Sequence, residues 1–184
     1  MLKIGVVGVG HLGQHHARKF LTIDGCTLSG IYDKNAQRAA EISEKLQVKN
    51  FATYEALLDE VDAIDIAATT SHHYDLAKTA LEMGKHVFLE KPITSELWQA
   101  EALIELAKQK NLKIQVGHIE RFNPVILKVE KDIADPVFIE SHRLSYFHHR
   151  GTDVPVVLDL MIHDIDLILD FVHSPVKEIR ASGV

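Results

Sequence analysis

The stretch Ile4-Gly5-Val6-Val7-Gly8-Val9-Gly10-His11-Leu12-Gly13 decides the fold of this chain. Its first part is a short apolar run that predicts a buried strand, and the residues from Gln14 to Leu21 have the pattern of a helix. A strand, a glycine turn and a helix in succession are the context in which a GxGxxG motif is typical of dinucleotide binding. The alternative is an ordinary glycine turn with no ligand.

Each glycine of the motif has a separate physical reason. Gly8 permits the tight turn, Gly10 lets a pyrophosphate approach the backbone, and Gly13 lets the helix pack closely on the strand. The helix N-terminus offers N–H groups and a partial positive charge to phosphates. We therefore expect the cofactor to lie against the glycines and the intervening His11 and Leu12.

A second apolar run, Thr27–Tyr32, ends in Asp33, which lies 20 positions after Gly13. An acid at this distance is expected to accept hydrogen bonds from the adenosine ribose, which favours NAD over NADP. Lys34 and Arg38 lie nearby and could soften that preference, which leaves NADP open as a cofactor. The alternative for Asp33 is a helix cap or a turn residue.

The composition is that of a soluble globular protein. The chain has 184 residues, of which 46% are hydrophobic and 25% charged, and a net charge of −6. This charge and the lack of a long basic run argue against nucleic acid as a partner. The apolar start is too short for a signal peptide or a membrane span. A single cysteine, Cys26, excludes an intrachain disulfide framework, so we expect a cytoplasmic protein.

Apolar runs alternate with helical patterns over the first 120 residues or so. The predicted strands are Leu2–Val7, Thr27–Tyr32, Asn50–Ala52, Ala63–Ala68, His86–Leu89 and Lys113–Val116. The predicted helices are His11–Leu21, Asn35–Leu46, Tyr54–Leu58, His73–Met83 and Ser95–Lys108. This alternation predicts an α/β fold, a doubly wound parallel sheet of the Rossmann type over residues 1–120.

Residues 121–184 have a different texture. The pattern predicts a helix from Asn123 to about Lys131, a strand over Val137–Phe147, a helix over Val156–Val172 and a strand over Val176–Val184. We interpret this as part of an α/β open-sheet domain, because two strands cannot close a sheet of normal width. We therefore expect a truncated product, a fragment, or a chain that needs a partner to cover its edges.

Two candidate clusters follow predicted strands, where a doubly wound fold binds its ligands. After Ala63–Ala68, the hydroxyl of Thr69 and the imidazole of His73 can contact a nicotinamide ribose; the alternative is helix capping by Thr70 or Ser71. After His86–Leu89 comes Glu90-Lys91-Pro92. Beside a cationic nicotinamide the Lys91 ammonium would be destabilised, which makes it a candidate for proton transfer. The alternative is an exposed charged turn.

A third cluster lies within Val156–Val172. Asp159 and His163 are four residues apart on one predicted helix face, and Asp166 follows on that face. An aspartate can orient a histidine for acid–base work. The alternatives are surface salt links and a capping acid. The apolar residues around them are expected to form core: Val157, Leu158, Leu160, Ile162, Ile165 and Leu167.

Polar residues also follow Lys113–Val116. His118, Arg121 and Asn123 can bind a polar or phosphorylated substrate, or they can tie the two parts of the chain together. The twelve histidines suggest a metal site as a further alternative, with candidate ligands His142, His148, His149 and His163. No metal-binding motif supports it, so we expect no metal.

Taken together, these motifs resemble the Gfo/Idh/MocA family of sugar and cyclitol oxidoreductases, and the likeness runs through nearly the whole chain. It rests on the glycine motif, Asp33, His73, Glu90-Lys91-Pro92 and the segment from Asp159 to Asp166. The resemblance implies NAD(P)-dependent oxidation or reduction of a sugar hydroxyl. It also implies that Lys91 holds the reacting hydroxyl, that His163 is the acid/base, and that Asp159 contacts the substrate or orients the site.

Within the family, residues 10–17 and 158–166 are similar to bacterial members that act on the 3-hydroxyl of UDP-N-acetylglucosamine. The chain departs from the family in lacking glycines before Asp159 and in its length. The resemblance implies a homo-oligomer once the second domain is complete. The competing hypothesis is a non-catalytic dinucleotide-binding fragment or regulatory protein, and a metal-dependent enzyme is a third.

Overall fold

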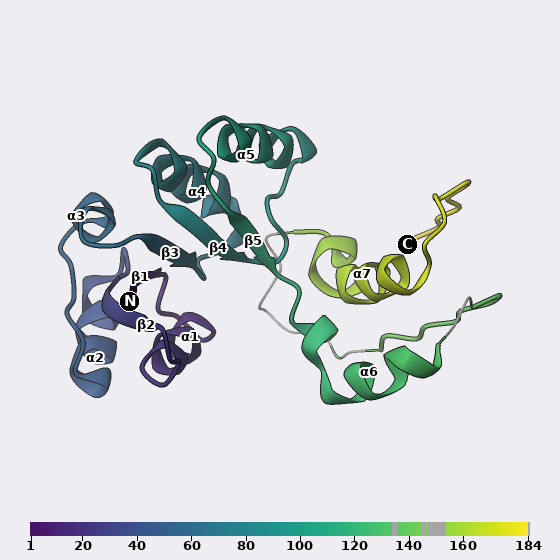
Figure 1. The fold of residues 1–184 in the computed structure, drawn as a ribbon, viewed down its shortest axis with the longest axis horizontal. Coiled ribbons are helices and arrows are strands. Elements are labelled where there is room, and N and C mark those ends of the chain that lie inside the picture. The colour runs from purple at the N-terminus through teal and green to yellow at the C-terminus, as the bar shows by residue number, and fades with distance from the viewer. Residues whose placement is uncertain (134–135, 145, 147–153, 184) are drawn as a thin grey trace. The chain divides into compact units, whose positions relative to one another are not determined.

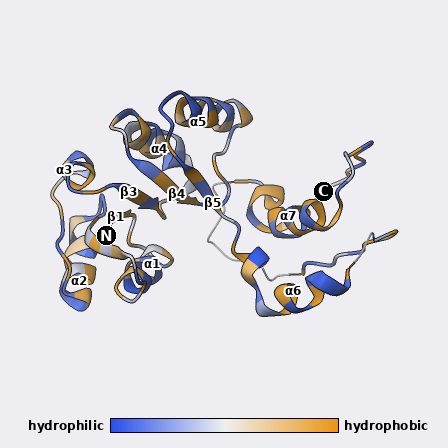
Figure 2. Ribbon diagram, viewed as in Figure 1, coloured by the Kyte–Doolittle hydropathy of each residue, from blue (hydrophilic) through white to orange (hydrophobic). Residues whose placement is uncertain are grey.

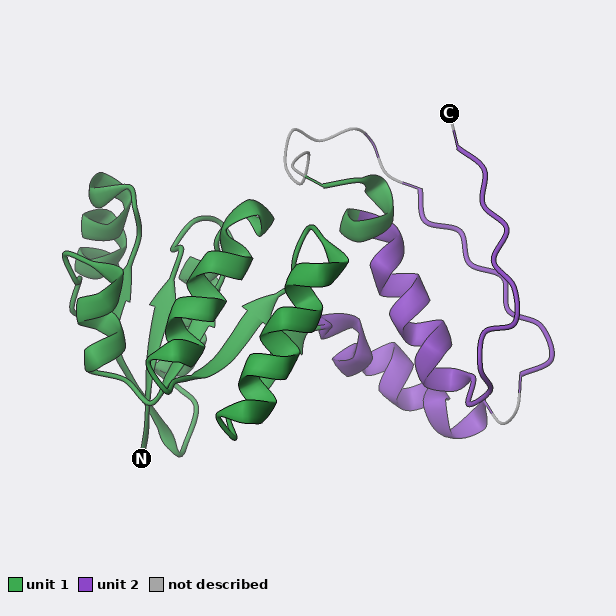
Figure 3. Cartoon of the chain, turned by 90° about the horizontal axis from the view of Figure 1, so that it is seen from above, with its two compact units in different colours: residues 1–117, 148–159 green, residues 118–147, 160–184 purple. Residues whose placement is uncertain are grey.

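The computed structural model describes residues 1–133, 136–144, 146 and 154–183 (Figure 1). The chain divides into two units (Figure 3). The first comprises Met1–Gly117 and the described residues 154–159. The second comprises residues 118–133, 136–144, 146 and 160–183.

A single parallel sheet forms the centre of the first unit (Figure 1). Its strands are β1 (Leu2–Val7), β2 (Cys26–Tyr32), β3 (Ala63–Ile66), β4 (His86–Glu90) and β5 (Ile114–Gly117). They are ordered β2-β1-β3-β4-β5, and every neighbouring pair is parallel. The strand order therefore reverses beside β1, which creates the crevice where doubly wound sheets bind ligands.

Helices cover both faces of this sheet. The helices are α1 (Gly13–Phe20), α2 (Ala36–Leu46), α3 (Tyr54–Asp59), α4 (His73–Glu82) and α5 (Leu97–Gln109). On one face Val6 packs with Ala17 of α1 and Ile42 of α2. On the other face Val7 belongs to the core cluster formed with α3, α4 and α5. Consecutive residues of β1 thus enter opposite cores, as the alternation of side chains along a strand requires. The helices carry hydrophilic residues as well as hydrophobic ones (Figure 2).

The predicted α/β doubly wound sheet is confirmed, and most element bounds agree to within two residues. The exception is the strand predicted at Asn50–Ala52, which is wrong. Asn50 makes only an isolated bridge with Ile31. The chain turns immediately afterwards, because the Thr53 hydroxyl caps α3 by accepting a hydrogen bond from the amide of Ala56.

The regular structure in the described part of the second unit is helical. A 3₁₀ turn (Ile119–Phe122) precedes α6 (Pro124–Val129), and another 3₁₀ turn (Glu130–Asp132) follows it. A π turn (Val157–Met161), which the first unit shares, runs into α7 (Ile162–Phe171). The predicted helix over Val156–Val172 is therefore confirmed.

The two predicted strands of the second unit are wrong for the residues that the structure describes. Residues 137–144 and 146, and residues 176–183, have no strand conformation. A strand is stable only when a neighbouring strand satisfies its backbone hydrogen-bonding groups. The side-chain pattern of these segments alone does not supply such a neighbour.

The two units also differ in how far their hydrophobic side chains are buried. Among the described residues, every buried hydrophobic side chain lies between Ile4 and Ala107. The expectation of core residues around α7 is therefore wrong: Val157 is 45% exposed and Ile165 is 38% exposed. The described residues of the second unit form helices and irregular segments, so that unit offers no sheet face to cover Ile165. In the described part of the chain, no helix has the length and apolar character needed to span a membrane.

Candidate functional site

The glycine turn between β1 and α1 has the geometry that the motif predicts at Gly8 and Gly13. Gly8 has a φ of +83°, and a Cβ there would lie 2.7 Å from the amide nitrogen of Ala68. A Cβ at Gly13 would overlap the carbonyl oxygen of Gly8. Neither position can hold a side chain without moving backbone. The two glycines therefore fold the loop tightly against the sheet.

Gly10 is different, because a Cβ there would meet no atom within 4 Å. Its side of the loop is open, which is the condition for a ligand to approach the backbone. No acidic residue lies in the first turn of α1, and its N-cap Leu12 makes no side-chain capping bond. The ring of His11 is exposed and meets the ring of His15 edge-on. The loop thus fits the pyrophosphate of a dinucleotide.

Asp33 follows β2 directly and joins the glycine loop to it. Its Oδ2 accepts a hydrogen bond from the amide of Val9 at 2.8 Å, and its Oδ1 accepts one from Asn35 at 2.9 Å. These two bonds confirm the interpretation of Asp33 as a turn residue. It does not compete with ribose binding, because each carboxylate oxygen can accept more than one hydrogen bond. Arg38 donates to the carbonyl of Val9 and so lies beside the glycine loop, whereas Lys34 contacts His72 in the turn after β3.

The segment after β3 places Thr69 and His73 differently from each other. Thr69 is exposed, with its hydroxyl 3.4 Å from that of Ser71. His73 is buried, and its ring nitrogens face the carbonyl oxygens of Pro92 at 2.9 Å and of Ala68 at 3.1 Å. His73 thus ties the start of α4 to the segment after β4. Neither the 3₁₀ turn at Thr70–His72 nor α4 has a side-chain cap, which contradicts the capping alternative for Thr70 and Ser71.

The most informative contact of the site lies at the end of β4. The Lys91 ammonium donates to the carbonyl oxygen of Asp159 at 2.7 Å and to its Oδ1 at 3.0 Å. Both residues belong to the first unit. The Lys91 side chain is only 16% exposed, so the exposed-turn alternative is wrong. Two of the candidate catalytic residues, 68 positions apart in the sequence, are therefore in contact.

The other candidates belong to the second unit. Arg121 donates from two nitrogens to Asp166, at 2.7 Å each, and also contacts Asp170. It ties the 3₁₀ turn Ile119–Phe122 to α7 inside that unit. Asn123 caps α6 by accepting a hydrogen bond from the amide of Val125. His163 is half-buried at the second position of α7, and its catalytic role stays a prediction.

Ion pairs hold the acids of α7. Arg143 binds Asp164, and this hydrogen bond lowers the pKa of the Asp164 carboxyl. Burial alone would raise the pKa of Asp166, but the hydrogen bonds from Arg121, together with the charges of His118, Arg121 and His163, outweigh burial and the pKa is lowered. Both acids are therefore ionised and engaged with arginine, so the surface salt links considered for this helix are confirmed for Asp166.

One cluster was missed by sequence reasoning. His16 of α1 lies between Asp65 of β3 and Glu90 of β4, with nitrogen–oxygen distances of 2.9 and 3.2 Å. Asp65 is 1% exposed. The available signal was an acid within the otherwise apolar strand Ala63–Ile66, because a fully buried carboxylate almost always has a partner.

The metal alternative finds no support among the residues that the structure describes, where no group of three or more potential ligands occurs. His142 pairs with Glu140 at 2.7 Å. Two of the proposed ligands, His148 and His149, lie outside the described residues.

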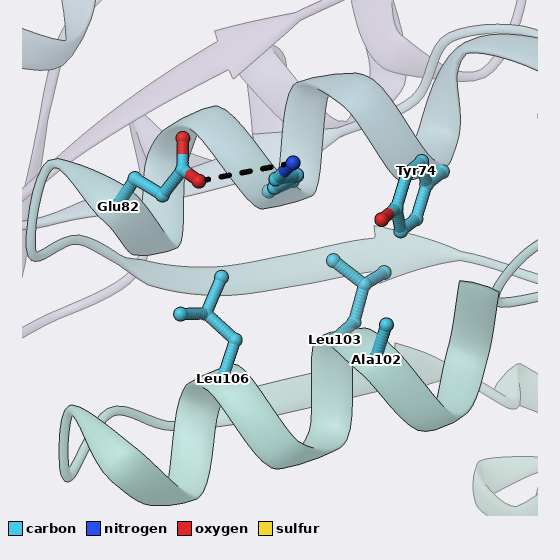
Figure 4. Close-up of a pocket in the computed structure, with 6 residues that line it drawn as sticks. Tyr74, Glu82, Ala102, Leu103 and Leu106 are labelled. Atoms are coloured by element: carbon cyan, nitrogen blue, oxygen red, sulfur yellow. Dashed lines mark ion pairs between the residues drawn. The ribbon is translucent and has the colours of Figure 1, made fainter. Parts of the chain in front are cut away.

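A shallow groove lies between α4 and α5, apart from every predicted site residue. Figure 4 shows side chains of the two helices facing each other across it, with an ion pair between Lys78 and Glu82 on the α4 side. Its lining residues are Tyr74, Lys78, Glu82, Ala102, Leu103 and Leu106. Most of them are apolar or already paired, so the groove offers no arrangement for proton or hydride transfer.

Comparison with known proteins agrees with this geometry. The model of an oxidoreductase family with an NAD-binding Rossmann fold matches residues 2–118. The chain is 41% identical over its 184 residues to the UDP-N-acetylglucosamine 3-dehydrogenase of Acidithiobacillus ferrooxidans, of which it spans 58%. It is 27% identical to the scyllo-inositol 2-dehydrogenase (NAD(+)) of Bacillus subtilis, over 99% of this chain and 57% of that protein.

Solved structures give the same result. The crystallised UDP-N-acetylglucosamine 3-dehydrogenase of A. ferrooxidans superposes with a TM-score of 0.87, over 93% of this chain and 56% of that one. An apo scyllo-inositol dehydrogenase from Lactobacillus casei, 27% identical, superposes with a TM-score of 0.77 over 94% of this chain and 55% of that one. The chain thus spans little more than half the length of these relatives.

Proposed function

Because the chain belongs to the Gfo/Idh/MocA oxidoreductase family with an NAD-binding Rossmann fold, we propose that it transfers a hydride between NAD and a hydroxyl or keto group of a sugar. The observation that carries the proposal is the contact of Lys91 with Asp159 at the end of β4. The strands β1, β2 and β4 are parallel, so their carboxyl ends lie on the same side of the sheet. The contact therefore lies at the same end of the strands as the glycine loop and Asp33.

In the proposed cofactor site, the dinucleotide lies across the carboxyl ends of these strands. Its pyrophosphate rests on the open side of Gly10 beside the N-terminus of α1, and Asp33 accepts hydrogen bonds from the adenosine ribose. Thr69, His73 and Glu90 follow β3 or end β4, and we assign them to the nicotinamide end. His73 acts there by holding the segment around Pro92, because both its ring nitrogens face backbone carbonyls.

Bound NAD supplies the hydride acceptor, and the chain supplies the proton chemistry. Lys91 holds the oxygen of the reacting hydroxyl. Its ammonium has three N–H donors, of which two are directed at Asp159 and the third is left for the hydroxyl. In the oxidation direction the O–H proton passes to His163, the C–H bond is cleaved with its electron pair leaving as hydride, and a C=O bond forms. Asp159 orients Lys91, and we assign Arg121 and Asn123 to substrate binding.

The substrate class that we propose is a nucleotide sugar. It is supported by the 41% identity to a protein named UDP-N-acetylglucosamine 3-dehydrogenase, against 27% to one named scyllo-inositol 2-dehydrogenase. We further propose a cytoplasmic location, which the free thiol of Cys26 favours, and a homo-oligomeric assembly of the whole protein.

The proposed function is tested with a Lys91→Met variant. NADH binding is measured by fluorescence titration, and turnover is measured on UDP-N-acetylglucosamine and on scyllo-inositol. The variant should bind NADH as the wild type does and lose turnover by about 10²–10⁴-fold, the contribution typical of acid–base catalysis. The matched control is Lys78→Met on the exposed side of α4, which should change neither quantity. Unchanged turnover in Lys91→Met would refute the assigned role.

The competing function is a dinucleotide-binding protein without catalysis. It predicts that the wild type binds NADH and turns over neither compound, in either direction. Copurification of a metal ion in stoichiometric amount would favour the third hypothesis, a metal-dependent enzyme.

A further inference from the structure

Three ionisable side chains meet on the face of the sheet that α1 covers. The Nδ1 atom of His16 lies 2.9 Å from Asp65 Oδ2, and its Nε2 atom lies 3.2 Å from Glu90 Oε1. The exposed fractions of the three side chains are 21%, 1% and 14% in that order. A histidine placed between two carboxylates in this way donates from both ring nitrogens, which requires the imidazolium form.

The register of the strands brings these groups together. Asp65 of β3 pairs with Phe88 of β4, and Glu90 lies two residues beyond Phe88 on the same face. The ring of His16 meets that of Phe88 edge-on, with centroids 6.1 Å apart. Glu90 is opposite Gly117 of β5, where a Cβ would approach its Oε1 to 3.2 Å. The carboxyl group of Glu90 is thus enclosed by a bare backbone on one side and His16 on the other.

The electrostatics of the cluster favour this arrangement. The hydrogen bonds to Asp65 and Glu90 raise the pKa of His16 to about 10. Burial raises the pKa of Asp65, and His16 opposes that rise. Burial would also raise the pKa of Glu90, but His16 and the backbone and charge of Lys91 outweigh it, so the pKa is lowered. The charged groups that act on His16 are therefore Asp65 from β3 and Glu90 from β4.

The cluster extends to the proposed catalytic lysine. The Oε2 atom of Glu90 accepts a hydrogen bond from the backbone amide of Lys91 at 3.3 Å, while its Oε1 atom faces His16. At the other end, His16 lies one turn into α1, the helix that begins at Gly13 of the dinucleotide loop. A continuous set of contacts therefore joins Asp65, His16, Glu90 and Lys91.

We propose that His16 is a positioning residue for Lys91: it anchors on the buried carboxylate of Asp65 and holds Glu90, which in turn fixes the backbone of Lys91. Its effect on turnover rests on the proposed function of Lys91, whereas its effect on the Lys91 backbone does not. The ion pair with Asp65 accounts for stability, and the contact with Glu90 accounts for positioning. These two parts can be separated by mutation.

The experiment compares His16→Gln, the double variant His16→Gln/Asp65→Asn, and the matched control His15→Gln, which changes an exposed histidine of the same helix. Thermal unfolding, NADH affinity, turnover and hydrogen exchange of the Lys91 amide are measured in each. The single variant leaves Asp65 buried without its cation and should unfold at a lower temperature. The double variant removes that charge and should recover most of the loss.

Positioning predicts a different result at Lys91. In the double variant the Lys91 amide should exchange about tenfold faster than in the control, the equivalent of one hydrogen bond. Turnover should fall by up to about a hundredfold at unchanged NADH affinity. A loss of this size is expected when a catalytic group is displaced by about 1 Å. If amide exchange and turnover recover together with stability, His16 only compensates charge and the proposal is wrong.

A measurement on the wild type covers the case in which the variants do not fold. The ¹³C resonances of the Glu90 carboxyl and the Lys91 carbonyl should titrate together with the ring nitrogens of His16, near a pH of about 10. Independent titration of the three groups would overturn the proposal. If Lys91→Met leaves turnover unchanged, the role assigned to Lys91 in the proposed function fails, and the amide and ¹³C measurements still decide the role of His16.

Discussion

The ammonium nitrogen of Lys91 lies 2.7 Å from the carbonyl oxygen of Asp159 and 3.0 Å from its Oδ1. Asp159 thus binds Lys91 through its backbone and through its side chain at once. The carboxylate of Asp159 offsets the positive charge of the Lys91 ammonium, and its carbonyl oxygen fixes the direction in which that ammonium points. Because Asp159 lies in a π turn, a local irregularity of the helix presents both groups to the lysine.

The first prediction concerns the charge of Asp159. Asp159→Asn keeps the carbonyl contact and the size of the side chain but loses the ionic bond. Turnover should fall by about tenfold, the equivalent of one charge-assisted hydrogen bond, with NADH affinity unchanged. The control is Glu101→Gln, an exposed acid of α5. Weaker NADH binding at normal turnover would place Asp159 in the cofactor site instead.

The second prediction separates two glycines of the loop. Gly13→Ala should destabilise the first unit by about 1–3 kcal/mol or more, because its Cβ would overlap the carbonyl oxygen of Gly8. Gly10→Ala should change stability by less than about 0.5 kcal/mol, since its Cβ meets no protein atom within 4 Å. The Gly10 variant should nevertheless bind NADH more weakly.

Urea unfolding followed by the fluorescence of Trp98, the single tryptophan, reports on the first unit, and NADH titration reports on the loop. Equal NADH affinity in Gly10→Ala and the wild type would mean that the dinucleotide does not lie against this glycine.

The third prediction concerns the choice of cofactor. Asp33→Asn removes the charge that repels a 2′-phosphate and keeps one acceptor oxygen, so it retains the hydrogen bond from the amide of Val9 or the one from Asn35, but not both. NADH affinity should fall by about tenfold, as expected for loss of a hydrogen bond to a charged group, and the preference for NADH over NADPH should narrow. Competitive titration of the two nucleotides measures both effects. Asp24→Asn, at an exposed turn, is the control, and an unaltered NADH/NADPH ratio in Asp33→Asn contradicts the ribose role.

The fourth prediction is a pH dependence of stability that originates at His16. Its pKa is about 10 in the folded chain against 6.5 for the unperturbed group, so the folded state binds more protons between these values. The stabilisation is complete below about pH 6.5 and declines as the pH rises towards about 10. The difference in free energy of unfolding between the wild type and His16→Gln should therefore shrink over that range.

Unfolding in urea at several pH values measures this difference, because titrations common to both proteins cancel. His15→Gln, which changes an exposed histidine of the same helix, is the control. A gap between the wild type and His16→Gln that widens with pH would show that His16 is not held as an imidazolium.

Local patterns were sufficient to predict most elements of the first unit, with the strand at Asn50–Ala52 as the exception, because alternating short apolar runs and helical patterns are typical of a parallel sheet covered by helices. The strand at Leu2–Val7 and the glycines at Gly8 and Gly13 have one conformation compatible with their sequence and burial. The same kind of pattern failed for residues 137–144, because alternation describes a strand only where another strand pairs with it. Sequence reasoning found Lys91 and Asp159 separately, and it passed over Asp65 because an acid in an apolar strand has no visible partner in the sequence.

The sequence by itself determined the type of sheet, the conformation of the glycine loop and the position of Asp33 at the end of β2, since each depends on residues close together in the chain. Only the tertiary structure decided that Lys91 meets Asp159 and that His16 joins Asp65 to Glu90. The physical reason is that such contacts depend on strand register and on which face of the sheet each side chain occupies. Those quantities are decided by the packing of the whole unit.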